Sequence, residues 1–157
     1  MIMIQNANPN NEALDHLNRT VINAAVFFAG ADQGLSDGHQ TAHGVLAQLV
    51  FWHEQYVETA QALLEQRPPL LKAGTFERLN QVARSHFAGD SMTMLAYDLS
   101  HLQKEFDHIV RELPDWSINF PIKHDSEPCS LSNRLVEIEQ HIRQHTRRFK
   151  RVELLKT

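Results

Sequence analysis

The chain has 157 residues, of which 42% are hydrophobic and 22% are charged, a balance typical of one globular domain with a buried core. The formal net charge of -4 gives no positive field that would draw the chain to nucleic acid or to an anionic membrane. The single cysteine, Cys129, excludes an intrachain disulfide and suits a reducing compartment. No apolar run approaches the ~18 residues of a membrane span, and the first residues lack a signal-peptide pattern, so we expect a cytoplasmic protein.

Helical periodicity dominates the chain, and no run shows convincing strand alternation. The spacing of apolar residues predicts a first helix over 10–29 and a second over 41–66. Pro68 and Pro69 follow the second helix and end it. This helix carries an apolar stripe with alternating steps of three and four residues, and His53 lies in the middle of the stripe.

The second half of the chain shows three capping signals. Thr75 is suited to begin a shorter helix, and Asp90 or Ser91 to begin a longer one. Ser130 is suited to cap the last helix, which the apolar spacing places over 131–155.

Four long amphipathic helices and one short helix predict an all-α fold, a four-helix bundle with an additional short helix, partly up-and-down. We expect it to occupy 1–157 as one domain, with 1–9 flexible. The segment 114–130 has no helical period, and long loops in compact domains are often functional. Bundle cores are a usual place for metal sites built from facing helices.

Three of the ten histidines occupy positions where imidazoles can act together. His141 and His145 are four residues apart, so they share one helix face and both can reach one ion. His145 lies on the apolar stripe of the last helix, as His53 does on that of the second. Three neutral imidazoles and an open position would form a catalytic-type site for zinc, nickel, iron or manganese.

The same residues have a second interpretation, which the pattern leaves open. Such a pair often arises by chance in a histidine-rich helical chain, and His53 could be a core histidine bonded to a carbonyl or to Tyr56. Glu137, one turn before His141, is a candidate fourth ligand, partner of a ligand or general base, or simply a solvated side chain. Cys129 in the long loop is either a reactive thiol or an inert one.

Two stretches resemble a known family. "VLAQLVFWHEQYVE" (45–58) and "LSNRLVEIEQHIRQHTRRF" (131–149), with a middle helix between them, resemble the DinB/YfiT-like superfamily, and within it the ClbS/DfsB-like group of four-helix-bundle proteins. The resemblance covers most of the chain and implies a DinB-like bundle.

The resemblance implies a metal held by one histidine from the second helix and an HxxxH pair from the last. His141 and His145 match that pair in register. The second helix departs from the pattern, because Gln48 stands where relatives often carry histidine. His53 comes five residues later, about 140° around the helix. Either His53 replaces the usual ligand through a shifted geometry, or Gln48 takes its place and the site is weakened or metal-free.

The first functional hypothesis is a divalent-metal-dependent transferase or hydrolase. The resemblance implies such enzymes among the relatives, including low-molecular-weight-thiol S-transferases and a thiol-dependent isomerase, and a ClbS-like branch that protects against a reactive genotoxin. In this hypothesis His53, His141 and His145 hold the ion, which activates a low-molecular-weight thiol or water against an electrophilic small molecule.

The pocket for that small molecule is expected beside the segment 114–130. Trp52, Tyr56 and Trp116 are its candidate lining residues, with Phe120 near the mouth. Trp116 and Phe120 have an alternative role, which is to pin this loop to the bundle.

The second hypothesis is a metal-free, non-catalytic bundle that binds a small molecule or a partner helix, and Gln48 favours it. The resemblance implies a homodimer on either hypothesis. No nucleic-acid or membrane partner is expected.

Overall fold

The computed structural model describes residues 9–156, so the flexibility predicted for 1–9 lies, except for Pro9, outside the described residues. The elements follow in the order α1 (Pro9–Gly30), α2 (Ala42–Leu64), α3 (Phe76–His86), α4 (Met92–Glu112), β1 (Asn119–Phe120), β2 (Cys129–Ser130) and α5 (Leu131–Leu155). Within 9–156, no helix is both long enough and apolar enough to cross a membrane.

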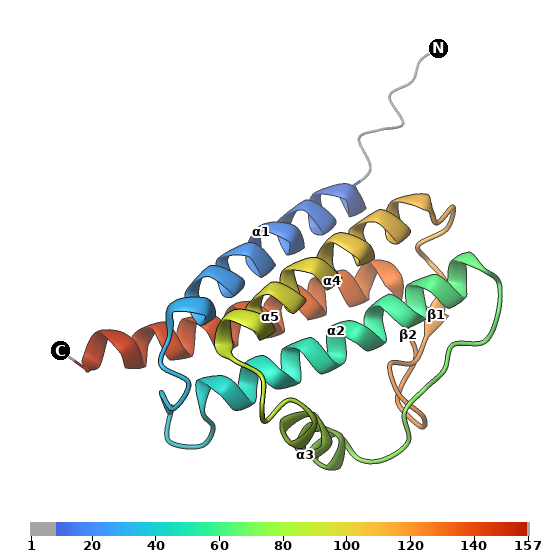
Figure 1. The fold of residues 1–157 in the computed structure, drawn as a ribbon. Coiled ribbons are helices and arrows are strands. Elements are labelled where there is room, and N and C mark those ends of the chain that lie inside the picture. Colours follow the sequence, from blue (N-terminus) through green and yellow to red (C-terminus); the bar gives the residue numbers. More distant parts are fainter. Residues whose placement is uncertain (1–8, 157) are drawn as a thin grey trace.

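Four long helices lie side by side, with α1 and α5 running in one direction and α2 and α4 in the other (Figure 1). α2 packs along α4, α4 along α1 and α1 along α5, whereas α2 and α5 scarcely touch. The bundle is therefore open between α2 and α5. The short helix α3 lies against α2 (Figure 1). The predicted all-α bundle with an additional short helix is confirmed.

Apolar side chains from every helix form one contiguous core. Phe28 of α1 and Phe149 of α5 are fully buried, and their ring centroids lie 5.9 Å apart in an edge-to-face arrangement. Such aromatic pairs stabilise a fold beyond the area that they bury, so this pair joins the first and last helices.

The helix starts agree with the predicted caps. The hydroxyls of Thr75, Ser91 and Ser130 each accept a hydrogen bond from the backbone N–H three residues on, which satisfies a donor that the first turn leaves free. Thr41 does the same for α2. It is therefore the cap of α2 and not its first helical residue, as the predicted range had it.

The segment 114–130 contains a small two-stranded ribbon that sequence analysis did not predict. β1 pairs antiparallel with β2, with Phe120 opposite Cys129. Strands of two residues are too short to show an alternating pattern. The indole N–H of Trp116 donates to the carbonyls of Val110 and Leu113, so Trp116 pins this segment to the end of α4.

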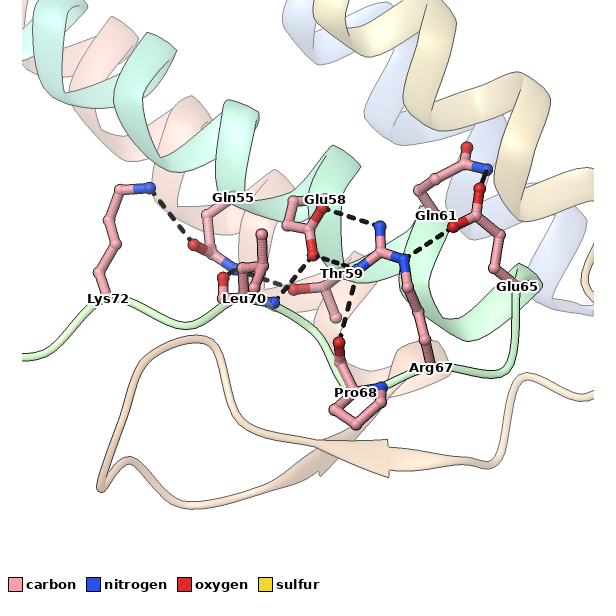
Figure 2. Close-up of polar contacts among 9 residues, drawn as sticks. All are labelled: Gln55, Glu58, Thr59, Gln61, Glu65, Arg67, Pro68, Leu70 and Lys72. Carbon is pink, nitrogen blue, oxygen red and sulfur yellow. Dashed lines mark hydrogen bonds and ion pairs between the residues drawn. The ribbon is translucent and has the colours of Figure 1, made fainter.

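A polar network ties the chain after α2 back onto that helix (Figure 2). Glu58 accepts two hydrogen bonds from the Arg67 guanidinium, at 2.8 and 3.0 Å, and one from the backbone N–H of Leu70, at 2.8 Å. The amide of Gln55 donates to the Leu70 carbonyl. These bonds fix the extended segment that leads to α3, and so hold α3 over the side of α2.

Candidate functional site

A cavity of about 380 Å³ lies where α2 and α5 diverge. Its size falls within the range of small-molecule pockets. α3 and two connecting segments contribute the rest of its wall. The lining residues are Gln40, Gln48, Leu49, Trp52, His53, Tyr56, Phe76, Asn80, Ile122, Ile138, His141, Ile142 and His145.

Six of the ten residues singled out in the sequence line this cavity, namely Gln48, Trp52, His53, Tyr56, His141 and His145. The other four do not. Phe120 and Cys129 lie opposite each other in the β1–β2 ribbon, outside the cavity wall. Glu137 is exposed and forms an ion pair with Arg134. Trp116 takes the structural role described above, and Ile122 is the residue that the long loop sends into the cavity.

The two histidines of α5 are hydrogen-bonded to each other. Their Nε2 atoms lie 2.8 Å apart. Nδ1 of His145 lies 3.3 Å from Nη1 of Arg148, and a guanidinium can only donate. His145 therefore accepts at Nδ1 and carries its proton on Nε2, which it donates to Nε2 of His141.

Both histidines are neutral near pH 7. Burial lowers the pKa of His145 to about 4, and His141 and Arg148 act in the same direction, against a weaker opposing effect of Asp37. His141 keeps an exposed face, yet the atoms packed around its ring, and then Arg148, still lower its pKa. The pair therefore presents uncharged imidazoles to the cavity.

His53 is fully buried, and one of its ring nitrogens, Nε2, is turned to α4. Its Nε2 lies 2.7 Å from Oε1 of Gln103, a residue of α4. Burial lowers the pKa of His53 to about 4, although the bond to Gln103 opposes the shift. Sequence analysis left open that His53 is a core histidine with a polar partner. At Nε2 this is what the structure shows, and the partner is the side-chain carbonyl of Gln103 and not Tyr56.

The remaining polar groups of the cavity are amides in fixed positions. Gln48 donates from Nε2 to Oε1 of Gln40 at 2.8 Å, which leaves its own carbonyl oxygen as an acceptor. Trp52 donates its indole N–H to Oδ1 of Asn80 at 2.7 Å. This bond fixes the orientation of the indole ring between α2 and α3.

The metal ligands predicted from the sequence do not converge in this geometry. Among residues 9–156, no group of three or more His, Cys, Asp or Glu side chains could hold a metal ion. His53 turns its Nε2 to Gln103, and Gln48 offers only an amide oxygen, a poorer ligand than imidazole for zinc, copper or nickel. The residues as placed do not fit a three-histidine centre, so metal binding stays a prediction.

Sequence reasoning missed the cavity residues that do not belong to the two quoted stretches. Gln40, Phe76, Asn80 and Ile122 come from α3 and from connecting segments. Periodicity identifies which face of a helix is buried but not which helix it meets, so it gave no signal for these four.

Comparisons with known proteins show the fold of this chain. No family model and no curated protein matches it. One solved structure that does match is described as the crystal structure of the mycothiol-dependent maleylpyruvate isomerase. The TM-score is 0.74 at 10% sequence identity, and the match covers 94% of this chain and 63% of that one. The chain therefore shares the fold of that protein, and its place in the DinB/YfiT-like superfamily stays a prediction.

Proposed function

We propose that this chain binds a small, uncharged molecule in the cavity between α2 and α5, and that the molecule carries a thiol. The observation that carries the proposal is the composition of the cavity wall. It contains no Lys, Arg, Asp or Glu side chain, and its three histidines have lowered pKa values. A charged ligand would lose its hydration there without gaining a counter-ion.

The polar groups of the cavity suit orientation of a ligand better than proton abstraction. An efficient general base has a pKa near the working pH, and burial lowers the pKa of His145 to about 4. Neutral imidazoles beside the apolar walls of Trp52 and Ile138 act as hydrogen-bond partners that fix one end of a ligand.

The thiol is proposed by analogy with the solved structure of the same fold, whose description names a thiol-dependent isomerase. The chain spans 63% of that protein's length, so the activity of that protein is not transferred here. S-transfer or detoxification of a reactive molecule, and a place in the ClbS/DfsB-like group, are the finer forms of this proposal.

A second candidate is the metal-dependent enzyme predicted from the resemblance. The observation in its favour is the convergence of the His141 and His145 Nε2 atoms, which are the atoms that a shared ion would bind. This candidate requires a third ligand, so it predicts that His53 or the Gln48 carbonyl oxygen moves when metal is added.

Metal analysis and thermal unfolding distinguish the two candidates. Protein purified without a histidine tag, as wild type and as His145→Ala, is analysed for transition metals before and after reconstitution with zinc, nickel and manganese. Both forms are then melted with and without mycothiol, and His108→Ala, an exposed site on α4, serves as control.

The proposal expects no stoichiometric metal, and a rise in melting temperature with mycothiol that His145→Ala abolishes and His108→Ala retains. About one equivalent of metal that is lost in His145→Ala would establish the second candidate instead. No stabilisation of wild type by mycothiol would reject the thiol as the ligand.

A further inference from the structure

A chain of hydrogen bonds crosses the core from the surface to His53. Arg111 donates to the Asp107 carboxylate, and Asn18 donates from Nδ2 to Oδ1 of Asp107 at 2.9 Å. Gln103 donates from Nε2 to Oδ1 of Asn18 at 2.7 Å, and Nε2 of His53 lies 2.7 Å from Oε1 of Gln103. The chain links α4, α1, α4 again and α2.

The carboxylate at one end fixes the direction of every bond. The oxygen and nitrogen of a side-chain amide are normally hard to tell apart, but a carboxylate held by a guanidinium can only accept. Asn18 must therefore turn its NH₂ to Asp107 and its oxygen to Gln103. Gln103 in turn presents its oxygen to His53, so the proton of His53 is on Nε2.

The lone pair of neutral His53 is consequently on Nδ1. Nδ1 has no hydrogen-bond partner among the described residues. Within 9–156, only two side-chain nitrogen or oxygen atoms are both fully inaccessible to solvent and without a hydrogen-bond partner, namely Arg134 Nε and Glu153 Oε2. Nδ1 of His53 is not one of them, so this unpartnered atom keeps some accessible surface.

The two nitrogens of this ring face different parts of the molecule. His53 lines the cavity between α2 and α5, which receives no residue from α1 or α4. Gln103 and Asn18 instead line a separate hollow on α1 and α4. Nε2 therefore points away from the cavity, and Nδ1 is the ring nitrogen that opens toward it.

We propose that Nδ1 of His53 is a hydrogen-bond acceptor for the O–H or N–H group of a cavity ligand, and that Gln103 is the positioning residue that fixes this tautomer. His53 is then a second polar subsite, separate from the His141–His145 pair, and not the third ligand of a metal. The ligand class is an uncharged molecule with a hydrogen-bond donor on a compact apolar body. The identity of the ligand rests on the proposed function. The tautomer of His53 does not depend on any ligand.

The tautomer is tested first, by two-bond ¹H–¹⁵N correlation NMR of ¹⁵N-histidine-labelled protein at pH 7. In the wild type, His53 is expected to be protonated on Nε2 and unprotonated on Nδ1. Gln103→Met removes the acceptor at nearly constant shape and is expected to lose this single tautomer. Lys104→Met, the neighbouring exposed position, is the matched control and is expected to keep it. A proton on Nδ1 in wild type, or an unchanged tautomer in Gln103→Met, would overturn the inference.

The acceptor role is tested with two probes of the same size. Phenol has an O–H donor and fluorobenzene has none, so phenol is expected to shift the Nδ1 signal and fluorobenzene to leave it in place. Gln103→Met is expected to weaken phenol binding roughly fivefold, the loss of about one hydrogen bond.

Equal effects of the two probes on Nδ1 would overturn the inference. So would Zn²⁺ shifting His53 together with His141 and His145. Failure of mycothiol to bind would reject the thiol alone and leave the tautomer result intact.

Discussion

Each of the three cavity histidines is kept neutral by what surrounds its ring. For His145 and His141 the causes are burial and the nearby Arg148, and for His53 the cause is burial alone. A site of neutral imidazoles discriminates by hydrogen bonding and shape, because it has no charge to attract an ion.

The buried His53 makes the stability of the protein depend on pH. The unfolded chain takes up a proton near the ordinary pKa of 6.5, whereas native His53 does so near 4. The contribution of His53 to the free energy of unfolding is therefore expected to be constant above pH 6.5 and to fall as pH falls from 6.5 toward 4. That fall amounts to about 3 kcal/mol.

Urea unfolding at a series of pH values measures this effect. His53→Gln is expected to flatten the fall by about 3 kcal/mol. The part that remains includes the contributions of His145 and His141, whose pKa values are also lowered in the folded protein. His108→Gln, at an exposed site, should keep the full pH dependence. An identical slope in wild type and His53→Gln would show that His53 is not held neutral.

At the scale of elements, α3 and the segment between β1 and β2 complete a cavity that the long helices leave open. The network of Glu58 (Figure 2) fixes the chain leading to α3. Phe76 and Asn80 of α3 then close the cavity over α2. The cover of the site therefore depends on polar bonds at the end of α2 as well as on apolar packing.

Loss of the Glu58 carboxylate is expected to loosen that cover. Glu58→Ala removes the acceptor of the Leu70 backbone N–H, so this amide should exchange its hydrogen faster, by local opening. Glu65→Ala removes the other carboxylate partner of Arg67 but leaves the Leu70 amide bonded, and exchange there should be unchanged. Hydrogen-exchange NMR compares them, and equal rates at Leu70 would contradict the proposed role of Glu58.

The elements also show what a sequence can predict. The helices and the caps Thr75, Ser91 and Ser130 follow from local signals, namely apolar period and hydroxyl side chains at helix starts. The contact between the His141 and His145 side chains follows from their spacing of four residues alone. The direction of His53 does not, because Gln103 determines it from another helix, fifty residues away in the chain.

For the whole molecule, a single hydrophobic core holds the helices together and also forms part of the wall of the cavity between α2 and α5. α1 packs on both α4 and α5, whereas α2 and α5 are left apart. The cavity is thus the place where the bundle fails to close, and the core residues Leu49, Trp52, Ile138 and Ile142 form its apolar wall. The homodimer implied by the resemblance stays a prediction, which sedimentation velocity tests.

Removal of the ring that joins α1 to α5 is expected to destabilise the whole bundle. Phe149→Ala leaves a cavity at a fully buried position and should cost about 3–5 kcal/mol of the free energy of unfolding in urea. Val136→Ala, on the same helix but 45% exposed, should cost within about 0.5 kcal/mol. Similar losses in the two variants would contradict the assignment of Phe149 to the core.

The central claim is that an uncharged thiol binds in the cavity between α2 and α5, and the two tryptophans of the chain test it within one sample. The indole N–H of Trp52 lies in the cavity wall and that of Trp116 does not. In an NMR titration with 2-mercaptoethanol, the Trp52 signal should shift to saturation while the Trp116 signal stays in place. 2-Mercaptoethanesulfonate, which has a similar size but carries a charge, should shift neither. Equal shifts of both indoles, no shift of Trp52, or a response to the sulfonate as large as that to the neutral thiol would contradict the claim.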